Sequence, residues 1–172
     1  SEKDVIIRNS YALSKYAGEM AITGINSLIL RTNFFGKSKV FNRKSLTDWA
    51  LEKLLLDEKI LAYNDVLFNP LSMATLCGLI IDSINNNMSG TFNLGSHGGM
   101  SKADFLIYFA NLLNFDKKLI LPQSYNLANK SQIERPKNMI MDVAKFENNT
   151  KTILPNLKNE IDKSVMEYKN EI

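Results

Sequence analysis

One apolar run constrains the fold of this chain more than any other stretch of its sequence. Leu28-Ile29-Leu30 is uninterrupted, and polar residues and Gly36 follow it within a few positions. A short apolar run that ends in this way is typical of a buried parallel strand leading into a site. Such a strand is normally covered on both faces and paired on both edges. A predicted helix precedes it and alternating elements follow, so we expect an α/β fold.

Helices and short strands are predicted to alternate along the rest of the chain. Ser45 and Ser101 each stand three residues before an aspartate, a spacing typical of a capping box at a helix start. Apolar residues then recur at helical spacing after each serine. The expected helices cover residues 9–19, 45–58, 72–85, a segment from 101 and 156–170, and the expected strands cover 59–63, 91–94 and 119–122. Residues 123–137 are polar, and we expect them to be irregular.

The first predicted helix carries a tyrosine and a lysine four residues apart. In a helix this spacing places Tyr11 and Lys15 on one face, one above the other. A free tyrosine has a pKa near ~10, and a cation close to the phenol lowers that pKa towards neutrality. A tyrosine activated in this way can protonate a carbonyl oxygen while hydride arrives at the carbon. The same spacing also occurs by chance on solvated helices, where it has no catalytic role.

Two small side chains lead to predictions about packing. Gly18 lowers helix propensity by roughly 1 kcal/mol relative to alanine, so we expect a neighbouring segment to pack closely against it. Cys77 is the single cysteine and lies in the apolar run 76–81, where we expect a buried, inert thiol. A lone reduced cysteine is consistent with a reducing compartment.

The composition excludes several classes of protein. Hydrophobic residues make up 45% of the chain and charged residues 23%, as in a globular protein rather than a disordered one. The net charge of +3 comes from scattered side chains without a basic stripe, which argues against nucleic-acid binding. No apolar run reaches the ~18 residues of a membrane span, and no secretory signal opens the sequence. We therefore expect a cytoplasmic protein.

A glycine-rich loop over residues 95–99 contains the single histidine, His97. The loop does not have the spacing of a dinucleotide-binding turn, so we do not expect it to bind phosphate. His97 is expected to be an exposed surface residue. Without a second histidine or cysteines at metal-ligand spacing, the sequence predicts no metal site.

The order of motifs resembles one enzyme family. Asn9–Glu19 resembles the YxxxK active-site helix of the extended short-chain dehydrogenase/reductases, and Leu30–Gly36 resembles the strand and loop that follow it. Within that superfamily the chain is most similar to the dTDP-4-dehydrorhamnose reductase group of nucleotide-sugar reductases. Asp65–Pro70, Ser101-Lys102 and Arg135–Asn138 match that group in order and spacing.

The resemblance implies a domain organisation. Residues 1–36 would be the end of a Rossmann-type domain, and residues 37–172 would be mainly a small α/β substrate-binding domain with segments that return to the Rossmann-type core. The dinucleotide-binding half of the family, with its glycine-rich turn, has no counterpart here. Neither has the family's upstream catalytic serine or threonine. We therefore expect this chain alone to be inactive, and its bare strand edge to be covered by the missing half or by a second chain, with a homo-oligomer expected.

The resemblance also implies a reaction, the reduction of a nucleotide-linked 4-keto-sugar with NADP or NAD as the cofactor. Tyr11 would protonate the keto oxygen, while Lys15 would lower its pKa and hydrogen-bond the nicotinamide ribose. The implied cofactor contacts are Tyr11, Lys15, Thr32, Asn33 and Phe34. The implied substrate contacts are Asn33, Phe34 and Arg135, the last through a charge-assisted bond to the diphosphate.

Other interpretations stay open at this point. Arg135 would equally fit an exposed arginine before a proline, and Asn33 would fit a strand-end residue bonded to local backbone. The segment from Arg31 to Gly36 is one residue shorter than in the reductase group, and Phe34 stands near its usual tryptophan. Nucleotide-sugar epimerases and 4,6-dehydratases share the scaffold, and a non-catalytic binding or regulatory subunit would keep the fold without the chemistry.

Overall fold

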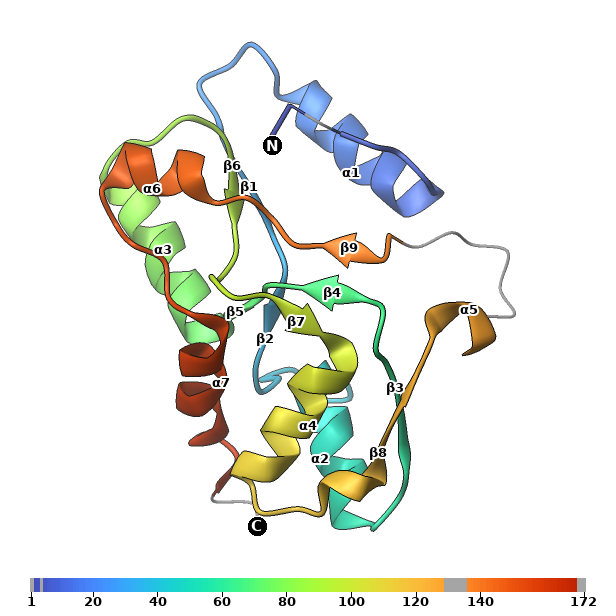
Figure 1. Ribbon diagram of the computed structural model, residues 1–172. Helices are drawn as coiled ribbons and strands as arrows, with labels where there is room; N and C mark the ends of the chain where they lie inside the picture. The colour runs from blue at the N-terminus through green and yellow to red at the C-terminus, as the bar shows by residue number, and fades with distance from the viewer. Residues whose placement is uncertain (1, 4, 129–135, 170–172) are drawn as a thin grey trace.

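Helices and strands alternate along the chain in the computed structural model, which describes residues 2–3, 5–128 and 136–169 (Figure 1). The longer helices begin at residues whose side chains accept backbone hydrogen bonds, as N-caps do. The helices are α1 (Ser10–Ala21), α2 (Leu46–Leu55), α3 (Met73–Asn85), α4 (Lys102–Leu112), α5 (Tyr125–Ala128), α6 (Ala144–Thr150) and α7 (Leu157–Val165), with a 3-10 turn η1 (Lys117–Leu119).

Parallel pairing dominates the strands, as expected for an α/β fold. The strands are β1 (Leu28–Thr32), β2 (Phe34–Phe35), β3 (Ile60–Tyr63), β4 (Leu67–Phe68), β5 (Leu71–Ser72), β6 (Gly90–Leu94), β7 (Met100–Ser101), β8 (Ile120–Gln123) and β9 (Asn138–Met139). The pairs β1–β6, β2–β5, β3–β8 and β4–β9 are parallel, and β4–β7 is antiparallel. The α/β class is therefore confirmed.

Two apolar clusters form the core. The larger lies between helices α2, α4 and α7 and the β3–β8 pair, and the smaller lies between helices α3 and α6 and the β1–β6 pair. Phe105 of α4 packs edge-on against Phe35, and Phe109 packs edge-on against Tyr168 beyond α7. In Figure 1, α2, α4 and α7 lie in the lower part of the molecule, whereas α1 lies in the upper part, away from them.

The predicted capping box is present at the start of α2, and at the start of α4 Ser101 caps the helix while the Asp104 carboxylate accepts from the Ser101 hydroxyl. Ser45 accepts a hydrogen bond from the backbone N–H of Asp48, whose carboxylate accepts one from the Ser45 N–H. Ser101 likewise accepts from the N–H of Asp104 at the start of α4. The predicted strand at 59–63 is confirmed as β3, and the predicted strand at 91–94 is confirmed as β6, one residue longer. The closing helix is shorter than predicted, because α7 ends at Val165.

Two packing predictions are wrong. A Cβ placed on Gly18 would meet nothing within 4 Å among the described residues, so no segment described here requires a glycine at that position. Cys77 is exposed rather than buried. The buried residues of α3 include Leu76, Leu79 and Ser83, which recur at helical spacing, and Cys77 lies about 100° around the helix from Leu76.

None of the described helices is both long and apolar enough to cross a membrane.

Candidate active site

Helix α1 begins at Asn9, whose side-chain oxygen accepts a hydrogen bond from the Ala12 N–H at 2.9 Å. No residue of this helix is buried. An ion pair fixes it to the neighbouring strand, because Arg31 of β1 donates from Nε and Nη2 to the two carboxylate oxygens of Glu19, at 2.8 and 2.5 Å. The hydrogen bond to Glu19 raises the pKa of Arg31. A bidentate pair of this kind fixes orientation as well as distance, so it holds α1 against β1.

Tyr11 and Lys15 lie on the same face of α1, as their spacing predicts. The Lys15 ammonium is 5.6 Å from the centroid of the Tyr11 ring. Tyr11 is 71% exposed and Lys15 is also exposed, so both side chains are open to a bound molecule.

Tyr11 faces a cleft of about 920 Å³ whose opposite wall comes from distant parts of the chain. A cavity of that size can hold a small-molecule substrate. The N-terminal end of α1 forms one side, and α2, β3, α4 and α5 supply most of the rest. The lining residues are Asn9, Ser10, Tyr11, Ala12, Leu46, Trp49, Leu61, Ala62, Tyr63, Val66, Lys102, Leu106, Tyr125, Pro136 and Met139.

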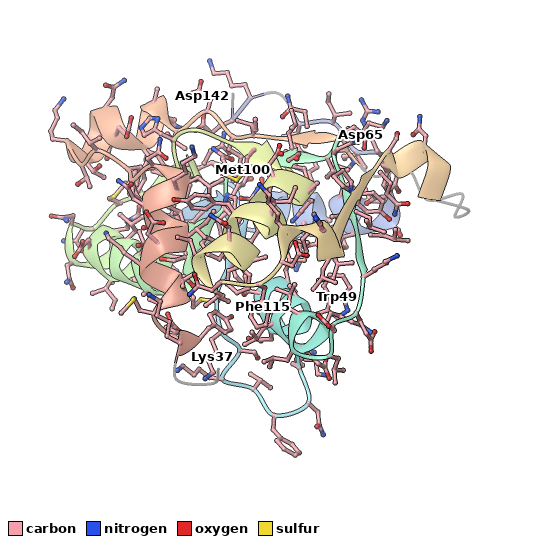
Figure 2. All side chains as sticks on the ribbon, turned by 60° about the horizontal axis from the view of Figure 1, so that its bottom comes forward. Lys37, Trp49, Asp65, Met100, Phe115 and Asp142 are labelled. Atoms are coloured by element: carbon pink, nitrogen blue, oxygen red, sulfur yellow. The ribbon has the colours of Figure 1, made fainter. Side chains whose placement is uncertain are left out.

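Three aromatic side chains line the cleft in addition to Tyr11: Trp49, Tyr63 and Tyr125. Trp49 of α2 packs partly on the core and partly lines the cleft. Tyr63 and Tyr125 meet edge-on, with ring centroids 5.2 Å apart. Figure 2, in which Trp49 and Asp65 are labelled, shows both on the side of the molecule where the β3–β8 pair runs. Flat aromatic faces of this kind suit a planar heterocycle or a sugar ring.

A carboxylate behind the wall holds Tyr125 in place. Asp65 accepts hydrogen bonds from the Lys137 ammonium at 2.7 Å, the Tyr125 N–H at 2.8 Å and the Ser124 hydroxyl at 2.8 Å. The hydrogen bond from Lys137, followed by those from Tyr125 and Ser124, holds the pKa of Asp65 well below its usual value. Asp65 therefore stays ionised near neutral pH and ties the start of α5 to the turn after β3.

Lys102 lines the cleft, a position that neither the predicted helix start nor the match of Ser101-Lys102 to the reductase group indicated. It is the first residue of α4, is partly buried, and its ammonium lies 3.5 Å from the centroid of the Phe68 ring. Burial lowers the pKa of Lys102 to about 8. One signal was available in the sequence, because a lysine directly after an N-cap serine opposes the helix dipole. Trp49, Tyr63 and Tyr125 carried no such signal.

The structure does not bring the predicted loop residues Thr32, Asn33 and Phe34 into the lining of the cleft. Asn33 donates from its side-chain amide to the Met139 carbonyl at 3.3 Å, while its buried Oδ1 has no partner among the described residues. Phe34 is 55% exposed. Arg135 lies outside the described residues.

The glycine-rich loop and His97 have structural explanations. A Cβ on Gly95 would come within 2.9 Å of the Asn69 side chain, and one on Gly99 would meet Ile140 and the Phe68 carbonyl. Both glycines therefore allow close backbone packing. His97 is exposed, as predicted, and its Nε2 lies 2.8 Å from a carboxylate oxygen of Glu147. Within the described residues, no three His, Cys, Asp or Glu side chains gather as a metal site requires.

Comparison with known families then places the chain. The family model described as RmlD substrate binding domain matches residues 5–170, nearly the whole chain. The chain belongs to this family. The resemblance to dTDP-4-dehydrorhamnose reductases, within the NAD-dependent epimerase/dehydratase superfamily, is therefore confirmed. A comparison with curated proteins gave no match.

Solved structures share the fold of this RmlD substrate binding domain. The dTDP-4-dehydrorhamnose reductase from Bacillus anthracis str. Ames, in complex with NADP, matches with a TM-score of 0.84 at 22% identity. The match covers 94% of this chain and 57% of that one. The dTDP-4-dehydrorhamnose reductase from Yersinia enterocolitica matches with a TM-score of 0.82 at 24% identity, over 96% of this chain and 59% of that one.

A third solved structure is that of an enzyme with a different activity. The dTDP-glucose 4,6-dehydratase from Bacillus anthracis str. Ames, in complex with NAD, matches with a TM-score of 0.78 at 15% identity. The match covers 99% of this chain and 55% of that one. The chain thus spans between half and two thirds of the length of these proteins, and at these identities the likeness concerns the fold.

Proposed function

We propose that the protein carrying this chain reduces the keto group of a nucleotide-linked 4-keto-sugar, with NADP or NAD as the cofactor. One observation supports the proposal most: Tyr11, with Lys15 beside its ring, lines a cleft that aromatic side chains from α2, β3 and α5 also line. Membership of the RmlD substrate binding domain family adds support, since solved proteins of this fold include dTDP-sugar enzymes in complex with NADP or NAD.

Tyr11 is the proposed proton donor. Its hydroxyl would hydrogen-bond the keto oxygen of a sugar bound in the cleft and transfer its proton as that oxygen gains negative charge. Lys15, one turn further along α1, would stabilise the phenolate that remains. A reduced nicotinamide, when bound, supplies the hydride.

The residues present fit a nicotinamide cofactor on this side of the cleft. Lys15 and the hydroxyl of Tyr11 lie on an exposed helix face, where ribose hydroxyls could accept and donate hydrogen bonds. The proposed cofactor contacts at Thr32, Asn33 and Phe34, and the substrate contacts at Asn33, Phe34 and Arg135, rest on the family resemblance. The division into a Rossmann-type part over residues 1–36 and a substrate-binding part over 37–172 is likewise a proposal.

The experiment is a stoichiometry measurement on the protein as its gene encodes it. A dTDP-linked 4-keto-6-deoxy-sugar is added with NADPH or NADH, while absorbance follows cofactor oxidation and chromatography follows the sugar. The proposal expects one reduced cofactor consumed for each sugar reduced. Sugar conversion without net cofactor consumption would instead identify an epimerase, or, with dTDP-glucose as a second substrate whose 6-hydroxyl can still leave as water, a dehydratase, the alternative that the dehydratase fold match favours. If neither the cofactor nor the sugar changed, the remaining interpretation would be a non-catalytic binding subunit.

A further inference from the structure

The cleft beside Tyr11 contains one charged side chain among its described lining residues. That side chain is Lys102, and the rest of the lining is apolar, aromatic or neutral polar. None of the described lining residues is a carboxylate. A cleft of this size with a single positive charge favours an anionic ligand.

Lys102 is held in a place that is unfavourable for a cation. It is the first residue of α4, where the exposed N–H groups of the helix already carry partial positive charge. The nearest carboxylate in sequence, Asp104, accepts a hydrogen bond from the Ser101 hydroxyl at 2.6 Å and so belongs to the helix cap. Within the described part of the chain, Lys102 makes no ion pair, and the ring of Phe68 is its close partner.

Partial burial of Lys102 makes the charged form of its side chain still less favourable. Loss of water around the ammonium lowers the pKa of Lys102 to about 8, so the charged form is poorly compensated when the cleft holds no ligand. The Phe68 ring supplies only part of what water would supply, because a ring face accepts no directed hydrogen bond from the three N–H groups. An anion in the cleft would compensate the charge in full.

We propose that Lys102 binds the diphosphate of the nucleoside diphosphate sugar in this cleft. The inference rests on the proposed function and adds a residue to it that selects for the charged part of the substrate. The diphosphate joins the sugar to the nucleoside that carries the base, so the residue that binds it must lie in one cleft with both Tyr11 and the aromatic side chains. Lys102 meets that condition. The nicotinamide cofactor also contains a diphosphate, and the experiment has to separate the two sources.

Trp49 provides the readout. It is the single tryptophan of the chain and lines the same cleft, so its fluorescence reports occupancy directly. The protein as its gene encodes it is titrated with dTDP, with thymidine and with NADPH, and each affinity is checked by calorimetry. Lys102→Met removes the charge and keeps most of the aliphatic stem over Phe68, while Lys102→Arg keeps the charge. Lys118→Met, at an exposed lysine in η1, is the matched control.

The proposal expects a selective loss. Lys102→Met should weaken dTDP binding by about 10- to 100-fold, the worth of a charge-assisted hydrogen bond, and change thymidine and NADPH binding by less than about twofold. Lys102→Arg should retain most of the affinity, and Lys118→Met all of it. Circular dichroism checks that each variant is folded, and Lys102→Gln is the second neutral variant if Lys102→Met does not fold.

Three results would overturn the proposal. Unchanged dTDP binding in both neutral variants would show that Lys102 does not contact the diphosphate. An equal loss for dTDP and thymidine would show that Lys102 only shapes the cleft. A loss confined to NADPH would assign Lys102 to the cofactor. In each case, stoichiometric cofactor oxidation by the parent protein would leave the proposed function standing, whereas its absence would refute that function separately.

Discussion

Replacing Glu160 with alanine should destabilise the chain more than any exposed change on the same helix. Glu160 is on α7, is inaccessible to solvent, and reaches the start of α3. Its Oε2 accepts from the Ser72 N–H at 2.8 Å and the Ser72 hydroxyl at 2.7 Å, and its Oε1 accepts from the Thr75 hydroxyl at 3.0 Å. One buried carboxylate thus joins two helices.

The size of the effect follows from which donors can find other acceptors. The two hydroxyl groups can rotate, but the Ser72 N–H is fixed and would be left buried without an acceptor, at a cost of about 1–3 kcal/mol. Bonds to a charged group contribute about 1.5–3 kcal/mol each, and regained carboxylate hydration offsets part of their loss. We expect Glu160→Ala to lower the free energy of unfolding by about 3 kcal/mol, a large part of the ~5–15 kcal/mol typical of a domain.

Glutamine should be milder than alanine at this position. Glu160→Gln keeps one oxygen for the Ser72 N–H, and its new amide N–H can donate to the Thr75 hydroxyl. The free energy of unfolding should still fall by about 1–2 kcal/mol, because the hydrogen bonds no longer go to a charged group. Urea unfolding followed by circular dichroism measures both variants. With a slope of about 2 kcal/mol per molar urea, Glu160→Ala should shift the midpoint by about 1.5 M.

Glu167→Ala is the control, since Glu167 is exposed just beyond α7 and its loss should change stability by less than about 0.5 kcal/mol. Equal midpoints for Glu160→Ala and Glu167→Ala would refute the reasoning. If Glu160→Gln were as unstable as Glu160→Ala, the unpaired Ser72 N–H would not be the main cause of the lost stability.

Two further predictions concern single side chains elsewhere. Gly18→Ala should raise the free energy of unfolding by about 1 kcal/mol in urea titrations, because the added Cβ meets nothing and alanine favours the helix; a lower midpoint would contradict this. Binding of dTDP, followed through Trp49, should weaken as pH rises through about 8, since Lys102 is charged only below its pKa. Among the described lining residues the other titratable groups are tyrosines, and Lys102→Arg should remove this pH dependence; an unchanged dependence in that variant would assign it to another group.

Local patterns in the sequence predicted local structure well. Ser45 and Ser101 begin helices because their side chains bond the N–H three residues on, and that interaction needs nothing beyond the next turn. The Tyr11 and Lys15 side chains share a face because helix geometry alone decides it. The apolar run at Leu28 became the parallel strand β1, but its residues are half-buried rather than buried, and its pairing with β6 is a contact between distant segments.

What the sequence could not predict depends on contacts between distant segments. Strands β2, β4, β5, β7 and β9 have two residues each, too few to show a period, and exist because a partner strand lies beside them. The lining of the cleft also depends on contacts between segments that are distant in the sequence. Trp49 and Tyr63 read as core residues of a helix and a strand, and only the packing of α2, β3 and α4 places them with Lys102 opposite Tyr11.

The central claim is that the Tyr11 hydroxyl delivers a proton to a sugar bound in the cleft. The most direct test is the turnover of Tyr11→Phe in the protein as its gene encodes it, measured as NADPH oxidation with a dTDP-linked 4-keto-6-deoxy-sugar. Loss of a general acid should lower kcat by about 10²- to 10⁴-fold, while dTDP affinity changes by less than about threefold. Turnover within about threefold of the parent protein would contradict the account.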